Sequence, residues 1–372
     1  MSFLTYLRRD LEQIFFKDRD PHAIPSMDGA FSPNDRLERT TPIGEPLPGA
    51  DALAEAPDGS IFVSAGNKVW RLSGACFENR SMFHGFDSEV GALAFHPDGR
   101  LLACTARGLV AVDGAGRKAL LAEAEGEALN CLTAVAAAPD GTIFVSDGST
   151  RHAAVDWCVD LMELNVLGRI ISCGPALDRA RVLQRGLNYP GGLAVAPDGY
   201  LWFTESFGHS LSRAPVTAPG SIGFIETVIR NMPGYPSRLT TTAGGGFWLS
   251  LFGVRTHLVE FVLKEDDFRY EMMRTIPRPY WIAPAISSKR DCLEPLQLGG
   301  LRALGIEKPW APPRSYGLLA RLDADGEVVD TLHSRVGGKN HGITNAMETA
   351  RGVVIVSKGS GRVLLQHAGA QQ

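Results

Sequence analysis

The feature that most constrains this chain is a phrase that recurs along it: an apolar strand, a Pro-Asp-Gly turn and a second apolar strand. The turn prolines stand at positions 57, 97, 139 and 197. Asp-Gly between two apolar runs is a strong hairpin signal, because glycine adopts positive φ at no steric cost. Two less regular copies begin at Ser237 and Thr344, which makes six copies in all.

Repeats of roughly 40 residues that each contain strands are typical of β-propellers, in which every repeat forms one blade. We therefore predict an all-β, six-bladed β-propeller over residues 49–366, preceded by a separate segment over 1–48. The alternative is an unrelated β-sandwich that uses common Asp-Gly turns. Four Pro-Asp-Gly turns at matching points of matching patterns favour the propeller.

Composition and charge exclude several classes of partner. The net charge is −4 and the chain has no basic stripe, so we expect no nucleic-acid partner. No apolar run approaches ~20 residues, so we expect no transmembrane segment. Charges at Arg8, Arg9 and Asp10 fall where a signal peptide needs its apolar core, so we expect a cytoplasmic protein.

Two segments depart from the repeat. Residues 3–16 carry apolar side chains at helical spacing and predict an amphipathic helix, followed by a proline-rich extended linker up to residue 48. This helix either packs on the rim of the propeller or contacts a partner or a membrane surface. A second proline-rich stretch, 275–315, predicts a long loop insertion between blades five and six. It is either a lid over the site or a surface insertion without a role.

Several runs, at 187–199, 204–213, 232–239, 245–250 and 316–328, resemble the strictosidine-synthase-like proteins of the senescence-marker/gluconolactonase propeller superfamily. The resemblance covers residues 45–366. It implies a six-bladed propeller whose ligand site lies at the mouth of the central channel. It also implies that the first residue of each inner strand points into the channel, where the hydrolases of the superfamily use Glu, Asn or Asp to hold a divalent ion, usually calcium.

Counting back from the turn prolines gives the corresponding positions in this chain, which are Asp51, Gly91, Thr133, Gly191, Ser237 and, in blade six, Thr344 or Asn345. Only Asp51 keeps a carboxylate, and a calcium site normally uses several charged oxygens. We therefore expect no metal cofactor, with Ca²⁺ bound only if the Asp51 site is retained. The strictosidine synthase reaction uses a glutamate in blade six. Asn345 lies nearest to that position, and asparagine cannot act as a general base.

The sequence leaves two classes of function open. The first is a small-molecule enzyme, either a lactone or ester hydrolase or a metal-free lyase or condensing enzyme. The second is a non-catalytic propeller that binds a ligand or a protein. The candidate catalytic residues are Asp51, Glu205, His341 and Asn345. The candidate substrate-binding residues are Thr133, Gly191, Ser237, Tyr235 and Lys358. His209 is a further acid–base candidate. Each of the ionisable residues also has a structural interpretation, such as capping a neighbouring backbone.

Overall fold

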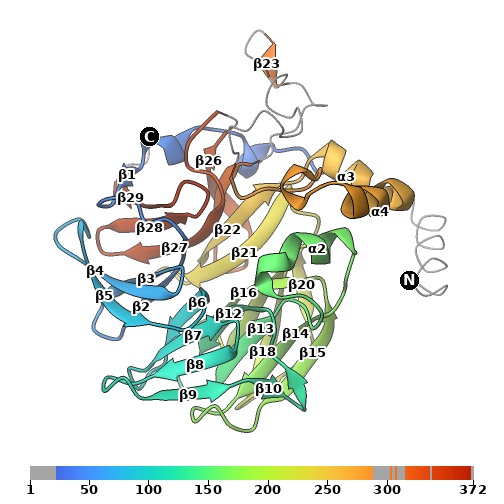
Figure 1. Cartoon of the computed structure of the whole chain (residues 1–372). Coiled ribbons are helices and arrows are strands. Elements are labelled where there is room, and N and C mark those ends of the chain that lie inside the picture. The colour runs from blue at the N-terminus through green and yellow to red at the C-terminus, as the bar shows by residue number, and fades with distance from the viewer. Residues whose placement is uncertain (1–21, 288–301, 304–305, 308–314, 336, 370–372) are drawn as a thin grey trace.

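A computed structural model describes residues 22–287, 302–303, 306–307, 315–335 and 337–369. Its strands form six antiparallel sheets around a central axis, which confirms the predicted six-bladed β-propeller (Figure 1). The predicted helix at 3–16 lies outside the described residues. Within the described part of the chain, no helix has the length and apolarity needed to cross a membrane.

The first two blades follow the predicted period, and blade three is lengthened by residues 148–167 between its second and third strands. Blade one consists of β2 (Ala50–Glu55), β3 (Ile61–Ala65), β4 (Lys68–Ser73) and β5 (Asn79–Gly85). Blade two consists of β6 (Val90–Phe95), β7 (Leu101–Thr105), β8 (Gly108–Val112) and β9 (Lys118–Leu121). Blade three consists of β12 (Leu132–Ala137), β13 (Ile143–Asp147), β14 (Gly168–Cys173) and β15 (Arg181–Leu187). A small hairpin, β10 (Glu123–Ala124) and β11 (Glu127–Ala128), precedes blade three.

Blades four and five contain further strands or segments beyond the simple four-strand repeat, and blade six takes one strand from the start of the described chain. Blade four consists of β16 (Pro190–Val195), β17 (Tyr200–Glu205), β18 (Ser210–Ala218) and β20 (Glu226–Ile229), with the short β19 (Ser221–Ile222) beside β18. Blade five consists of β21 (Gly234–Thr241), β22 (Phe247–Val254), β25 (Gly317–Leu322) and β26 (Val328–Ser334). Blade six consists of β27 (Ile343–Thr349), β28 (Gly352–Ser357), β29 (Arg362–His367) and β1 (Thr41–Pro42).

The insertion lies inside blade five and not, as predicted, between blades five and six. The chain leaves blade five after β22 and returns to it as β25, which pairs with β22. Between them lie α3 (His257–Lys264), α4 (Asp266–Thr275), the 3₁₀ turn η4 (Arg278–Tyr280) and the short pair β23 (Arg302–Ala303) and β24 (Ile306–Glu307). The prediction was wrong because the hairpin that follows the insertion has no sequence feature that identifies its blade. It was therefore assigned to blade six, whereas it pairs within blade five.

The segment predicted as a linker completes the ring. Thr41 pairs with Leu365, so β1 from the start of the chain forms the outer strand of the last blade. The preceding 3₁₀ turns, η1 (Gly29–Phe31) and η2 (Arg36–Arg39), lie against β26 of blade five. The side-chain amide of Asn34 donates to the Thr331 carbonyl at 3.0 Å. Blade six is therefore built from both ends of the described chain.

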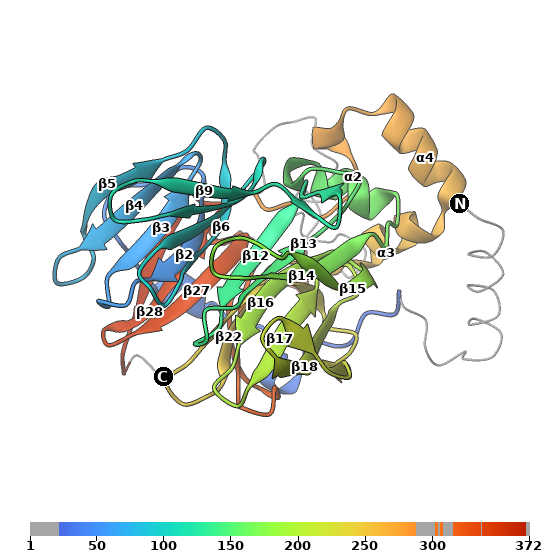
Figure 2. The same cartoon turned by 90° about the horizontal axis from the view of Figure 1, so that it is seen from below.

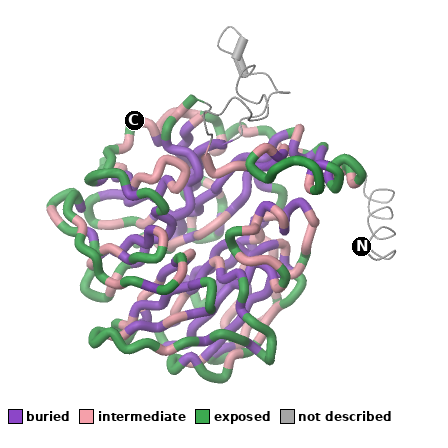
Figure 3. Tube along the Cα trace, in the orientation of Figure 1, coloured by how far each residue is buried: buried purple, intermediate pink, exposed green. Residues whose placement is uncertain are grey.

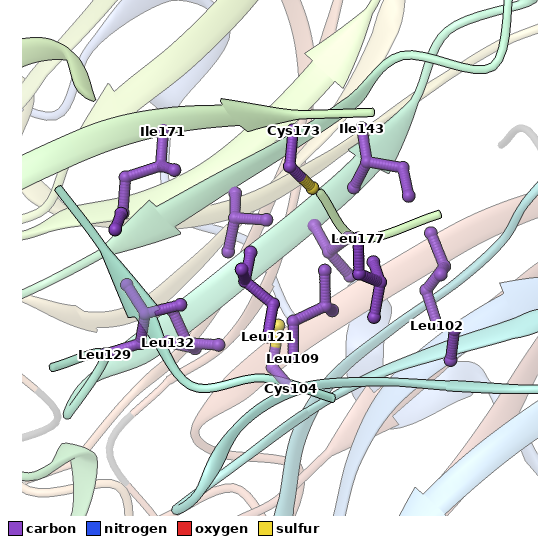
Figure 4. Packing of buried hydrophobic residues seen from close by; sticks show 14 of the residues in the cluster. Leu102, Cys104, Leu109, Leu121, Leu129, Leu132, Ile143, Ile171, Cys173 and Leu177 are labelled. Carbon is purple, nitrogen blue, oxygen red and sulfur yellow. The ribbon is translucent and has the colours of Figure 1, made fainter. Parts of the chain in front are cut away.

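Apolar side chains pack between neighbouring blades. Figure 4 shows one such layer between blades two and three, where Leu102, Leu109, Leu132, Ile143 and Ile171 meet. The buried stretches of the chain follow the strands, and exposed stretches gather at the connecting turns (Figure 3). Burying these faces is the main favourable contribution to the stability of the ring.

Helices cover one side of the propeller. The 3₁₀ turn η3 (Ala154–Asp156) leads into α2 (Trp157–Met162), which follows β13, and α2 lies beside α3 and α4 in both views (Figures 1 and 2). Leu161 of α2 and Val259 of α3 share an apolar cluster with Tyr235 and Phe252 of blade five. This cluster fixes the position of Trp157 at the edge of the channel.

Candidate functional site

A local irregularity recurs at the start of every inner strand. In each blade the pairing register of the inner strand shifts, and the shift falls at the position that the repeat identifies, namely Asp51, Gly91, Thr133, Gly191, Ser237 and Thr344. Such β-bulges leave a residue unpaired and re-aim its side chain, and they are frequent beside active sites. All six positions line one cavity, which confirms that the repeat brings them together.

The cavity has a volume of about 120 Å³ and lies at one mouth of the central channel. Its polar side is formed by the bulge residues together with Ser206, Arg238 and Lys358. Its apolar side is formed by Leu132, Ala154, Trp157, Phe252 and Ile286. A small cavity with one polar side and one apolar side suits a small, partly apolar ligand.

The charged side chains at the cavity bond to one another, with Asp51 between Arg238 and Lys358. The Arg238 guanidinium donates from Nη1 to Asp51 Oδ1 at 2.8 Å. The Lys358 ammonium donates to the other carboxylate oxygen, Oδ2, at 2.5 Å. Burial acts to raise the pKa of the Asp51 carboxyl, but the two cations outweigh burial and hold this pKa below its usual range. The carboxylate is therefore ionised at neutral pH, and both of its oxygens are engaged.

The bulges also release backbone carbonyl groups, which accept hydrogen bonds from side chains. Arg238 Nη1 donates to the carbonyls of Asp51 at 3.1 Å and Thr344 at 3.2 Å, and Nη2 donates to the carbonyl of Gly91. The Thr133 hydroxyl donates to the Pro190 carbonyl at 2.5 Å. These bonds satisfy groups that the sheet ladder leaves unpaired.

Glycine is required where blades four and five approach each other. A Cβ atom on Gly191 would lie 2.3 Å from the Ser206 hydroxyl oxygen, and one on Gly192 would lie 2.3 Å from the Ser237 carbonyl oxygen. Real Cβ atoms do not approach oxygen so closely. Gly192 is thus explained by backbone packing between blades four and five, and Gly191 by the Ser206 side chain, whose hydroxyl is held on the Pro236 carbonyl.

The structure places most of the predicted substrate-binding residues in the cavity. Thr133, Gly191, Ser237 and Lys358 all line it. Tyr235 does not line it. The Tyr235 ring is buried behind Phe252, stacked on it with ring centroids 5.3 Å apart. The Tyr235 side chain points into the apolar cluster under α3, a direction that the sequence pattern around it does not show.

Three of the four predicted catalytic residues lie away from the cavity. Glu205 Oε2 accepts from the Asn188 backbone N–H at 2.7 Å, so Glu205 caps a neighbouring turn. His341 lies between the Ser315 hydroxyl, 2.7 Å away, and the Arg335 carbonyl, 3.0 Å away. Asn345 faces a second cavity farther along the channel. Of the predicted catalytic residues, Asp51 alone lines the channel-mouth cavity.

His209 is also structural. Its Nδ1 lies 3.0 Å from the Gly234 carbonyl, and its ring is buried against Tyr235. Burial, together with the positive charge of Arg255, lowers the pKa of the His209 imidazole to about 3. The ring is therefore neutral at physiological pH and takes no part in the cavity.

Sequence reasoning missed Arg238, Trp157 and Phe252. Arg238 directly follows Ser237, and the register shift in blade five spans both residues. Counting one channel residue per blade therefore overlooked the second one. Trp157 is the first residue of α2, in the insertion that follows β13, and its place over the channel depends on packing that no local pattern shows.

The residues at the cavity do not fit a calcium-type ion. Among the residues that the structure describes, Asp51 is the only carboxylate that lines it, and Arg238 and Lys358 bond to its oxygens. Among the described residues, no three His, Cys, Asp or Glu side chains come together in a metal-binding group. Calcium normally takes six to eight oxygen ligands, several of them charged.

Together, the fold and this cavity define a six-bladed β-propeller with a candidate small-molecule site at one mouth of its channel. Residues 52–273, more than half of the chain, match the family described as SMP-30/Gluconolactonase/LRE-like region. The chain belongs to this family, which confirms the superfamily resemblance.

Curated relatives agree with this assignment. Strictosidine synthase-like protein 6 of Arabidopsis thaliana is 29% identical over 181 residues, which cover 48% of this chain and 48% of the relative. An adipocyte plasma membrane-associated protein of Danio rerio is 24% identical over 62% of this chain and 60% of the relative. The match to the first of these spans about half the length of the relative.

Solved structures show the same fold at low identity. A gluconolactonase of Xanthomonas campestris superposes with a TM-score of 0.56 at 14% identity, covering 88% of this chain and 89% of that one. A calcium-binding protein, regucalcin, of Agrobacterium tumefaciens superposes with a TM-score of 0.57 at 14% identity, covering 88% of this chain and 93% of that one. At this identity the likeness supports the fold alone.

Proposed function

We propose that the protein is a small-molecule enzyme that hydrolyses a lactone or an ester in the channel-mouth cavity, without a divalent ion. The observation that carries this proposal is the position of Lys358, an ammonium group anchored on Asp51 and facing a cavity with an apolar wall. Membership of the SMP-30/gluconolactonase family supports a hydrolytic reaction.

Lys358 is the group best placed to act on a carbonyl. An ammonium has three N–H donors, and its bond to Asp51 uses one of them. The side chain is 35% exposed, so the other donors are accessible from the cavity. A fixed positive charge beside an ester carbonyl stabilises the oxyanion that forms when water attacks. Asp51 orients this ammonium and is a weak base, because its pKa is held low.

The size of the cavity limits the substrate. A cavity of about 120 Å³ is small for a ligand site and favours a ligand the size of one ring or a short acyl group. Trp157 and Phe252, with ring centroids 5.3 Å apart, would cover the apolar part of this ligand. We therefore expect small lactones and short aryl esters to be better substrates than long-chain esters.

A condensation of the strictosidine synthase type fits less well. In blade six, Thr344 occupies the cavity position, and its hydroxyl donates to the Asp51 carbonyl at 2.7 Å. Asn345 faces the other cavity. No carboxylate of blade six therefore reaches the candidate site among the described residues.

A second candidate function is ligand binding without catalysis. The observation that favours it is that both Asp51 oxygens are already bonded to cations, so none of the described residues at the cavity offers a free carboxylate to deprotonate water. Under this alternative a ligand would raise the melting temperature without being turned over.

The test is hydrolysis of a panel of γ- and δ-lactones and p-nitrophenyl esters by chelator-treated protein. We expect turnover that persists in EDTA and falls at least ~100-fold in Lys358→Met, the size of effect seen when one oxyanion donor is removed. Glu205→Gln is the matched control, because Glu205 lies outside the cavity. Turnover that is absent, that requires calcium, or that is equal in wild type and Lys358→Met would contradict the proposal.

A further inference from the structure

The Arg238 side chain occupies an unusual position on the propeller axis. It leaves the inner strand of blade five, and its guanidinium bonds to groups of three other blades, at Asp51, Gly91 and Thr344. Four oxygens surround it, of which three are backbone carbonyls and one is a carboxylate. A set of carbonyl and carboxylate oxygens is the type of cage that holds a hard cation.

The origin of this cage lies in the bulges. The bulges of blades one, two and six leave the carbonyls of Asp51, Gly91 and Thr344 outside the sheet ladder, and these three carbonyls converge on the Arg238 guanidinium. Carbonyl dipoles that converge beside an ionised carboxylate need a positive partner, because a buried charge without one is costly. The Arg238 guanidinium supplies this positive charge at the centre of the molecule, where its side chain is only 13% exposed.

We infer that Arg238 is a covalently attached cation that takes the place of a bound ion at the propeller axis. Its planar group of five donors can bond several oxygens at once, which a compact ammonium cannot do equally well. Four blades are thereby joined through one side chain. The inference goes beyond the proposed hydrolysis, because it concerns how the ring is held and is tested without turnover.

Arg238 also divides the channel. It lines the channel-mouth cavity of about 120 Å³ and a second cavity of about 280 Å³. The second cavity is lined by later residues of the inner strands, among them Leu53, Ala94 and Thr240. The guanidinium therefore separates the two cavities, and a ligand that enters by one mouth of the channel is blocked at Arg238.

Chemical rescue tests the inference. We expect Arg238→Ala to melt roughly 5–10 °C below wild type, the shift that corresponds to breaking a buried ion pair. About 10 mM guanidinium or methylguanidinium should restore part of this loss, since denaturation needs concentrations near 1 M. Equal concentrations of urea should not restore it. Arg213→Ala is the matched control, because Arg213 is also partly buried and bonded to a carboxylate, that of Glu226, but lies away from the axis.

If Arg238→Ala does not fold, two further measurements decide whether Arg238 replaces a bound ion. The order of melting temperature should be wild type, then Arg238→Lys, then Arg238→Gln, because lysine keeps the charge and glutamine removes it. Wild type should melt at the same temperature in calcium and in EDTA. An Arg238→Gln variant at least as stable as Arg238→Lys, a foldable Arg238→Ala that guanidinium does not rescue, or a wild type that calcium stabilises would each overturn the inference.

Discussion

At the scale of single residues, position in the repeat was a better guide than chemical type. Asp51 was found because its place is fixed by the Pro-Asp-Gly turn that follows it. Glu205 and His341 were chosen for their ionisable groups, and both bond to nearby backbone or hydroxyl groups outside the cavity. Arg238 was missed because its role depends on oxygens from blades one, two and six, far away in the sequence.

Buried neutral imidazoles make the protein sensitive to acid. The pKa of His209 is lowered to about 3, whereas the unfolded chain takes up a proton near pH 6.5. Below pH 6.5 the unfolded state therefore binds more protons, and stability falls by up to about 1.4 kcal/mol per pH unit through this group. Asp51 adds to this loss only below about pH 5, where the carboxyl of the unfolded chain begins to take up a proton while the folded carboxylate stays ionised.

We predict that His209→Asn has a shallower loss of stability than wild type between pH 6.5 and pH 4. Asparagine suits the site because His209 has a φ of 50°, which asparagine tolerates. Urea denaturation at several pH values measures the slope. Parallel slopes for the two proteins would show that the His209 ring is protonated in the folded state.

At the scale of elements, the repeat predicted the blades well and the additions poorly. Each inner hairpin carries its own turn signal, so the start of every blade could be located. The strand at Thr41–Pro42 was missed, because two residues in a proline-rich segment give no periodic pattern and their pairing partner is Leu365 at the other end of the chain. The bulges were missed as well, because a register shift depends on the partner strand and not on local sequence.

The close approach of blades four and five gives a prediction for the inner strand β16. Gly192→Ala should lower the free energy of unfolding by about 3 kcal/mol, since the new Cβ would meet the Ser237 carbonyl oxygen at 2.3 Å. Gly91→Ala is the control, because a Cβ there would lie 3.5 Å from its nearest neighbour, the Leu132 carbonyl. Denaturant titration compares the two variants, and equal stabilities would refute the packing explanation.

At the scale of the whole molecule, the fold gathers at one mouth of the channel what the sequence scatters over 300 residues. Six bulges supply the polar side of the cavity, and α2 and blade five supply its apolar side. Blade six combines β1 with three strands from the other end of the described chain, and its inner strand β27 lies beside β2 of blade one, where the ring closes. The candidate site thus depends on closure of the entire ring.

The central claim is that substrate is processed at this mouth and not at the other one. Two variants place the same bulky side chain at the two rims. Ala154→Trp narrows the channel-mouth cavity and Thr241→Trp narrows the second cavity, and both residues are exposed. The measurement is kcat/KM of each variant on the best lactone or ester of the panel. We predict a loss of at least tenfold in Ala154→Trp and wild-type activity in Thr241→Trp. The reverse pattern would contradict the account.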